Sequence, residues 1–214
     1  ARTLINEMFS SRQMLAAMPV VIESKLSSTR NIKDVMQIEA QASADYWKRY
    51  YTSIGSKELT RRQAHPINDA LNALSRYQSG IILRWCLVHG LSPIHGFLHR
   101  RIEYDALIYD LMEPYRYLIE TAVKHAVSAC TVNASSTVLI DASTAAYKIL
   151  LNEEVLIEPT NQRVYRKAMF QGAVIALRHY LTKRMKRFMP PRETDNIKGR
   201  PFVCSYIVPG EIIR

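Results

Sequence analysis

The chain has 214 residues, of which 48% are hydrophobic and 22% are charged, and its formal net charge is +10. This length and composition allow a sizeable core in one large or two small domains and exclude a disordered chain, and no apolar run approaches the roughly 20 residues that span a membrane. Three cysteines without CxxC spacing favour reduced thiols in a cytoplasmic protein over a zinc site or a disulfide framework.

Helical patterns follow one another along the chain, so the sequence predicts an all-α, multi-helix fold. Pro66 suits the first turn of a helix and Gly90 a helix end. Apolar spacing places the helices at residues 4–18, 20–27, 32–54, 66–88, 107–126, 143–155 and 162–188. We expect residues 1–30 to form a linker and first helix, 31–200 a helical domain with a basic C-terminal helix, and 201–214 a tail with a possible hairpin.

Four polar side chains interrupt the apolar pattern and form a candidate metal site. Glu39 falls inside the apolar stripe of helix 32–54, where a lone carboxylate needs a partner. Asp110 and Glu113 are three residues apart and share a helix face, and their repulsion is relieved by a proton, a cation or water. His99 precedes Asp110 by eleven residues. Carboxylates with one imidazole suit Mg²⁺ or Mn²⁺, and the imidazole slightly favours Mn²⁺.

Simpler structural roles compete with this interpretation. Asp110 and Glu113 could form a capping box, with Asp110 as the N-cap, and Pro114 would suit the first turn of that helix. Glu39 could pair with an arginine or face solvent. The metal interpretation gains support because carboxylates occur on two separate helices.

Two further residues are candidates for supporting roles around the site. Tyr46 lies two turns after Glu39 on the same face, so it could form a hydrogen bond near the metal or pack in the core. Arg116 lies one turn beyond Glu113 and could orient that carboxylate, bind a phosphate or form a structural ion pair.

The positive charge is concentrated near the C-terminal end of the chain. Residues 161–200 contain eleven Lys and Arg against Glu193 and Asp195, which is +9 of the net +10. Such density predicts an anion-binding surface, with nucleic acid as the first candidate partner and an acidic protein as the second. The residues that we expect to contact DNA lie off the apolar stripe of helix 162–188: Arg178, Lys183, Arg184, Lys186 and Arg187.

Several blocks of this sequence resemble the CRISPR adaptation integrase family, in the family's order and over roughly residues 25–120. The blocks are EAQA (39–42) followed by Tyr46-Trp47, PIN (66–68), GLSP (90–93), GFLH (96–99) and DLMEPYR (110–116). Ser92 replaces the family's common aspartate, and His95 stands where a small or aromatic residue is usual. Neither departure affects the proposed ligands.

The resemblance implies an all-helical catalytic domain with Mg²⁺ or Mn²⁺ on Glu39, His99 and Glu113, and with Asp110 as an adjoining catalytic carboxylate. It also implies insertion of spacer DNA into a CRISPR array by 3′-hydroxyl transesterification. The expected partners are spacer-precursor and CRISPR-repeat DNA, further copies of the chain and a small adaptation protein. The family's N-terminal β domain is expected to be absent from this chain.

Two alternative functions stay open. A casposon-type transposase or branched-DNA nuclease of the same superfamily would share the site and differ in its target DNA. In a non-catalytic helical DNA-binding subunit, the four side chains would be structural.

Overall fold

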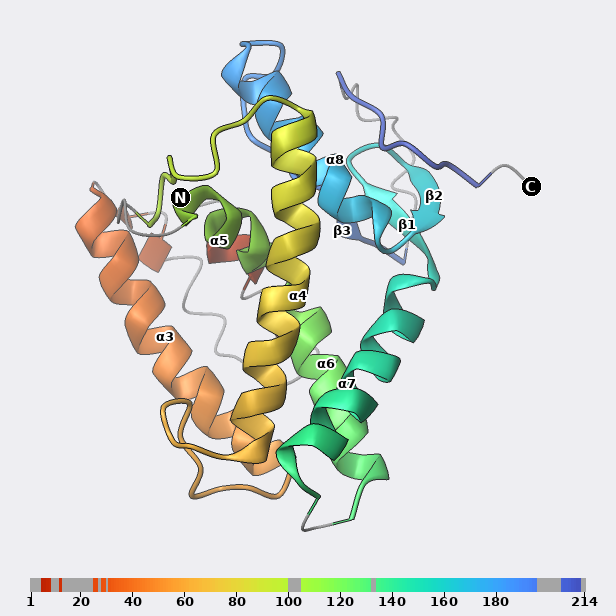
Figure 1. The fold of residues 1–214 in the computed structure, drawn as a ribbon. Coiled ribbons are helices and arrows are strands. Elements are labelled where there is room, and N and C mark those ends of the chain that lie inside the picture. The colour runs from red at the N-terminus through yellow and green to blue at the C-terminus, as the bar shows by residue number, and fades with distance from the viewer. Residues whose placement is uncertain are drawn as a thin grey trace.

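The protein is mostly helical, with a small antiparallel sheet beside the helices (Figure 1). A computed structural model describes residues 5–8, 12, 25–26, 28–29, 31–99, 105–131, 134–195 and 205–212. The predicted helical class is confirmed, and the sheet is an addition to it. The elements are α3 (Ile32–Ser53), α4 (Pro66–Val88), α5 (Ala106–Met112), the 3₁₀ turn η1 (Glu113–Tyr115), α6 (Arg116–Ala129), α7 (Ser136–Leu151), β1 (Glu154–Glu158), β2 (Gln162–Tyr165), α8 (Ala168–Leu181) and β3 (Arg192–Glu193).

Local sequence explains where the two longest helices begin and end. The Asn31 side chain accepts a hydrogen bond from the backbone N–H of Asp34 at 2.9 Å and caps the start of α3. Pro66 occupies the first turn of α4, where its missing N–H is not needed. Gly55 and Gly90, with φ of +75° and +69°, follow the two helices in the left-handed conformation that favours glycine. Both predicted helices are therefore confirmed.

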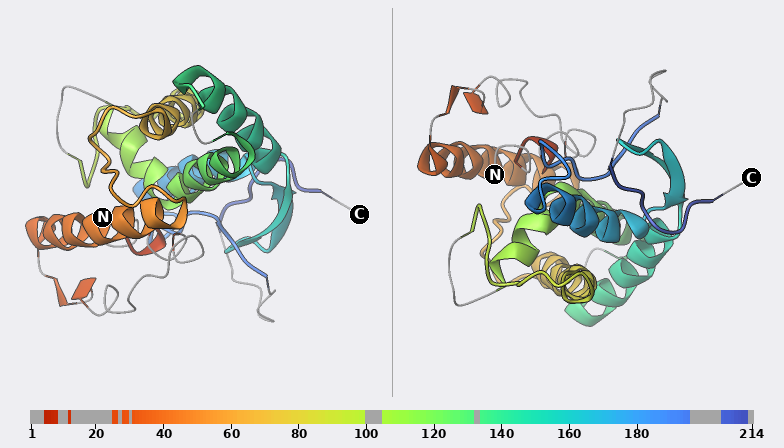
Figure 2. Two further views of the ribbon diagram at one scale, coloured as in Figure 1. Left: turned by 90° about the horizontal axis from the view of Figure 1, so that it is seen from below. Right: turned by 90° about the horizontal axis from the view of Figure 1, so that it is seen from above.

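Helix α4 is the centre of the bundle and packs against α5, α6, α7 and α8. Its Leu71, Leu74 and Ile82 are each 1% exposed, and burying one such side chain contributes roughly 1.5–3 kcal/mol. Helix α3 lies at the edge, and Figures 1 and 2 show its first half standing away from the other helices. Three tyrosines in its second half are fully buried: Tyr46, Tyr50 and Tyr51.

The helices predicted for residues 143–155 and 162–188 are wrong in their bounds. Helix α7 begins earlier, after Ser135, whose hydroxyl caps it, and gives way to β1 at Glu154. Residues of β2 alternate between buried and exposed, which is the two-residue period of a strand. Asn161 has φ of +55° in the turn between β1 and β2, a conformation that interrupts a helix. Helix α8 stops at Leu181.

The C-terminal residues that the structure describes lie beside strand β2 of the sheet. The sheet order is β2-β1-β3, and Val164 of β2 forms an isolated bridge to Glu211. The backbone N–H of Ile212 donates to the Arg163 carbonyl at 2.8 Å. Within residues 205–212 the tail therefore pairs with β2 and forms no hairpin with itself. At the other end of the chain, most of the helices predicted for residues 4–18 and 20–27 lies outside the described residues. Among the helices that the structure describes, none is long and apolar enough to cross a membrane.

Candidate functional site

The buried carboxylate of Asp110 gathers the loop that precedes α5. Asp110 is fully buried, and its Oδ2 accepts hydrogen bonds from the backbone N–H groups of Phe97 at 2.6 Å and Leu98 at 2.9 Å. Its Oδ1 accepts from the His99 backbone N–H at 3.1 Å and lies 2.6 Å from Nδ1 of the His99 ring. One carboxylate therefore fixes both the backbone and the side chain of His99.

The capping-box interpretation of Asp110 is wrong. Asp110 lies inside α5, whose N-cap is Asp105, and its side chain bonds to the loop eleven to thirteen residues earlier in the chain. The Asp-x-x-Glu spacing suggested a cap, but an N-cap carboxylate accepts from its own helix two or three residues later. Pro114 does occupy a first turn, that of η1, which Glu113 begins.

Gly96 allows the loop to approach Asp110 this closely. A Cβ atom built on Gly96 would lie 2.3 Å from the His99 carbonyl oxygen and 2.9 Å from both Asp110 Oδ2 and Ala106 Cβ. No side chain fits in that space, so the GFLH block needs its glycine for a packing reason.

The His99 ring is oriented as a metal-binding imidazole would be. Its side chain is 31% exposed, and its Nδ1 faces Asp110. The hydrogen bond with Asp110 raises the pKa of His99, outweighing partial burial, and the charge of Glu113 raises it further. Hydrogen bonding of one ring nitrogen to a carboxylate sets the direction of the other nitrogen, which is how proteins orient histidine ligands.

Glu113 and Arg116 form an ion pair at the same place. Arg116 Nε lies 3.0 Å from Glu113 Oε1, and the Glu113 side chain is 8% exposed. That buried Nε–H does not point at an acceptor in the part of the chain that the structure describes, so the contact is an ion pair without a hydrogen bond. Arg116 therefore pairs with the Glu113 carboxylate, and its role in orienting that carboxylate stays a prediction.

Glu39 is the predicted ligand that the structure does not bring to the other three. It lies partly buried on α3 and accepts a hydrogen bond from Ser43 Oγ at 2.7 Å. It is in the first half of α3, the helix at the edge of the bundle in Figure 1. No group of three or more His, Cys, Asp or Glu side chains among the described residues is placed to hold a metal ion, and this includes His99, Asp110 and Glu113.

The donor set nevertheless fits a divalent cation. His99 presents an imidazole already held by a carboxylate, and Glu113 presents a nearly buried carboxylate within electrostatic reach of it. Oxygen ligands with one imidazole suit Mn²⁺ and Mg²⁺. Glu39 would have to approach from α3 to complete three protein ligands.

Tyr46 proves to be a core residue, and its partner Glu120 was missed by the sequence analysis. The Tyr46 hydroxyl donates to Glu120 Oε2 at 2.6 Å, and Arg12 Nε lies 3.1 Å from both Glu120 oxygens. Glu120 follows Glu113 by seven residues, so helical spacing alone could have placed both on one face. Arg12 carried no such signal, because it lies 108 residues away in sequence.

The five predicted DNA-contacting residues are all exposed, but only one lies on a helix. Arg178 is in the last turn of α8, and the other four follow in the turn at 182–187. Phe188 then packs edge-to-face on Phe97, with ring centroids 6.3 Å apart. Because Phe97 belongs to the loop that carries His99, the basic turn adjoins the candidate site. Arg166 and Arg192 of the same segment form ion pairs with glutamates and contribute less to this surface.

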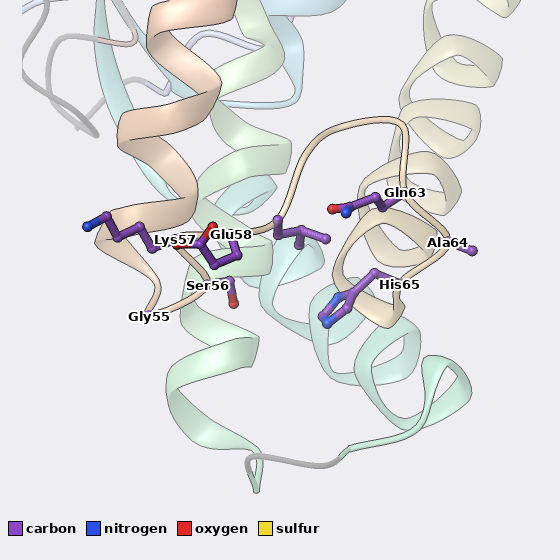
Figure 3. A pocket seen from close by; sticks show the side chains of 8 residues that line it. Gly55, Ser56, Lys57, Glu58, Gln63, Ala64 and His65 are labelled. Atoms are coloured by element: carbon purple, nitrogen blue, oxygen red, sulfur yellow. The ribbon is translucent and has the colours of Figure 1, made fainter.

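An open hollow elsewhere on the surface is separate from these residues. It is formed by the connection between α3 and α4, where Lys57, Glu58 and His65 line it (Figure 3). It includes none of the predicted site residues.

Comparisons with known proteins identify a family that this chain matches. A family model described as CRISPR associated protein Cas1 matches residues 10–156. Two Pyrobaculum aerophilum proteins, the CRISPR-associated endonucleases Cas1 2 and Cas1 1, are 32% and 26% identical to this chain over 103 residues. Those matches cover 46% and 48% of this chain and 34% of each relative, so the matched part is about a third of their length.

Two solved structures share the fold. A casposase bound to integration product has a TM-score of 0.75 at 19% identity, covering 87% of this chain and 64% of that chain. A Cas1 protein from Thermotoga maritima has a TM-score of 0.67 at 16% identity, covering 85% of this chain and 64% of that chain. At these identities the likeness shows the fold alone.

Proposed function

Because this chain belongs to the Cas1 family of CRISPR-associated proteins, we propose that it is the helical catalytic part of a metal-dependent DNA integrase and endonuclease. The observation that carries the proposal is the bonding of His99 to Asp110 beside Glu113, with an exposed basic turn next to the same loop. Side chains suited to binding a cation therefore lie next to a surface suited to binding phosphates.

We assign His99 and Glu113 to a bound Mg²⁺ or Mn²⁺, with Glu39 as the third protein ligand from α3. Such an ion supplies Lewis-acid polarisation of a scissile phosphate and lowers the pKa of an attacking 3′-hydroxyl or water. The residues of the chain do the rest. Asp110 holds the His99 ring, Arg116 holds the Glu113 carboxylate, and neither needs to touch DNA.

The proposed substrate is DNA, and the proposed reaction is transesterification by a 3′-hydroxyl that inserts a spacer into a CRISPR array. The exposed basic turn supports phosphate binding, because Lys and Arg there can neutralise the backbone without reading bases. The casposase that shares this fold is bound to integration product, which supports DNA as the partner of this chain. A homo-oligomer and a small adaptation partner protein belong to the same proposal.

Single substitutions of the three assigned ligands test this function. Glu39→Ala, His99→Ala and Glu113→Ala should each abolish strand transfer of a 3′-hydroxyl oligonucleotide while leaving DNA affinity largely intact. The reason is that metal ligands act on the transition state, whereas affinity comes mainly from phosphate contacts. Transfer products and binding isotherms with Mn²⁺ would be measured side by side, with His125→Ala on the exposed face of α6 as the control.

Strand transfer by His99→Ala at the rate of the unaltered protein would show that the metal assignment is wrong. A non-catalytic DNA-binding subunit predicts instead that crystals soaked in Mn²⁺ show no anomalous signal at His99 and Glu113. The casposase fold match favours a transposase as the second candidate, and target choice separates the two enzymes. A CRISPR integrase inserts at the leader-repeat junction, and a casposon-type enzyme inserts at an unrelated site.

A further inference from the structure

We infer that Arg12, Tyr46 and Glu120, hereafter the Glu120 cluster, are positioning residues that set the separation between the proposed ligands Glu39 and Glu113. This inference rests on the proposed function, since it concerns the same metal site. It assigns the cluster a role beyond core stability, because the cluster joins the two helical segments from which the carboxylates project.

The Glu120 cluster is the polar contact between α3 and α6. The Tyr46 hydroxyl donates to Glu120 Oε2 at 2.6 Å, and the neighbouring Tyr50 hydroxyl donates to the Glu120 backbone oxygen at 2.9 Å. Arg12 lies 3.1 Å from both carboxylate oxygens through Nε, and its guanidinium carbon is 4.5 Å from the centre of the Tyr46 ring. All these residues are at most 2% exposed, so the bonds are shielded from water.

Helical spacing connects this contact to the metal site. Glu39 precedes Tyr46 by seven residues, and Glu113 precedes Glu120 by seven residues. Seven residues of α3 are two helical turns, or about 10 Å along its axis, and Glu113 lies in η1, the 3₁₀ turn that leads directly into α6. Both helices run downward in Figure 1, and each carboxylate precedes its contact residue along the sequence. Arg12 feels the charges of both Glu120 and Glu113, so Glu113 lies within electrostatic reach of the cluster.

Glu39 lies two helical turns from the contact, so a small change of angle at the contact displaces it. Because Glu39 lies about 10 Å from Tyr46 along the helix, a tilt of about 6° at Tyr46 moves Glu39 by about 1 Å. A displacement of that size is enough to spoil the geometry of a reacting site. The angle at which α3 leaves the Glu120 cluster therefore determines whether Glu39 reaches a cation held by His99 and Glu113.

The electrostatics of the cluster make that angle stiff. Burial alone would lower the pKa of Arg12, but the charge and hydrogen bonds of Glu120 outweigh it and raise that pKa above its ordinary value. Burial and the Glu120 charge together raise the pKa of Tyr46, so its hydroxyl keeps its proton and remains a donor. Removing Arg12 or Glu120 would leave an unpaired buried charge and threaten folding. Tyr46→Phe is the milder test, because it removes one hydroxyl and keeps the ring.

The experiment is a double-substitution cycle read by the Mn²⁺ dissociation constant. Four forms of the chain would be titrated with Mn²⁺ alone: unaltered, Tyr46→Phe, Glu39→Gln and both together. Tyr46→Phe should weaken Mn²⁺ binding on the order of tenfold, as loss of supporting bonds around metal ligands does. In the Glu39→Gln background it should cause no further loss, because the cluster acts by placing Glu39.

Tyr147→Phe is the matched control. Tyr147 is also fully buried, and its hydroxyl donates to Gln78 Oε1 at the same 2.6 Å between α7 and α4. It should leave Mn²⁺ affinity unchanged while losing comparable thermal stability. If Tyr46→Phe does not fold, Tyr50→Phe removes the adjacent bond to the Glu120 backbone and carries the same expectation.

Three results would overturn the positioning role: no change with Tyr46→Phe, an equal loss in the Glu39→Gln background, or an equal loss with Tyr147→Phe. Failure of the proposed function looks different. In that case the unaltered chain binds no Mn²⁺, or Glu39→Gln binds it as tightly as the unaltered chain, and the positioning role falls with the site.

Discussion

Asp110 satisfies three backbone N–H groups and one imidazole from a fully buried position. Asp110→Asn would replace one acceptor oxygen with an NH₂ group that faces these donors. We expect the free energy of unfolding to fall by about 3 kcal/mol or more, since a buried charge-assisted network loses its acceptor. Urea unfolding measures this change, and Asp45→Asn on the exposed face of α3 should leave the stability almost unaltered. Equal stability of the two variants would refute the role given to Asp110.

His99 makes metal binding depend on pH. Its pKa is raised above the ordinary value of 6.5, first by the Asp110 hydrogen bond, so at pH 6.5 the imidazolium predominates. A metal binds the neutral ring, and Mn²⁺ affinity should therefore rise as pH increases through and beyond 6.5. The metal-free chain should show the opposite trend, because stability from a raised pKa is complete below 6.5 and lost as pH passes the folded-state value. Calorimetric titration with Mn²⁺ from about pH 5.5 to about pH 8 tests the first trend, and thermal unfolding of the metal-free chain over the same range tests the second. An affinity that is flat or falls would contradict this assignment.

Residue types at the site were predictable, but their contacts were only partly so. The candidate residues stand out in the sequence by their type and position: Glu39, His99, Asp110 and Glu113. The pairing of Glu113 with Arg116 follows from their spacing of three residues. The bonding of Asp110 to a loop does not, since helical spacing cannot reveal which backbone lies opposite a side chain. It remains a prediction that Glu39, His99 and Glu113 bind a metal ion.

At the scale of single elements, two glycines illustrate opposite constraints. Gly80 in α4 has no atom within 4 Å of a built Cβ, whereas Gly96 would place a Cβ 2.3 Å from the His99 carbonyl oxygen. Gly80→Ala should stabilise the protein by about 0.5–1 kcal/mol, because alanine restricts the unfolded chain and favours the helix. Gly96→Ala should destabilise it by about 1–3 kcal/mol, since backbone must move to admit the methyl group. Thermal unfolding of both variants would decide, and changes of the same sign would contradict the packing described for the GFLH loop.

The elements that the sequence predicted well are those whose ends carry their own signals. Asn31, Pro66 and Gly90 mark the bounds of α3 and α4 to within a few residues. The region after Leu151 lacks comparable signals in its apolar pattern. Val164 and Ala168 fit a helical period, but Val164 faces inward from a strand that pairs with Val155 of β1 and, through an isolated bridge, with Glu211. Strand pairing depends on such partners, which a periodic pattern does not identify.

At the scale of the whole molecule, the charge distribution predicts how DNA affinity depends on salt. Each Lys or Arg that neutralises a phosphate contributes about −0.9 to the slope of log affinity against log salt on duplex DNA. Replacing Lys183, Arg184, Lys186 and Arg187 by glutamine should flatten that slope by up to about three or four units. The loss should be similar for any DNA sequence, because phosphate contacts do not read bases.

A charge-matched variant controls for the loss of net charge. Lys33, Lys48, Lys57 and Arg62 are exposed on α3 and in the connection that follows it, and their replacement by glutamine removes the same charge. Its slope should remain close to that of the unaltered chain. Titrations on duplex and splayed-end DNA from low to physiological salt provide the measurement. Equal slopes for the two quadruple variants would favour an acidic protein partner for the basic turn.

The Glu120 cluster also has a consequence for the order of folding. Helices α6 and α7 pack on each other after a short connection, so their contact requires the closure of only a small loop. The bond from Tyr46 to Glu120 closes 74 residues, and the contact of Arg12 with Glu120 closes 108. Longer loops lose more chain entropy on closure and form more slowly. We therefore expect α3 to dock after the rest of the bundle, so the carboxylate of Glu39 would join the site among the last steps of folding.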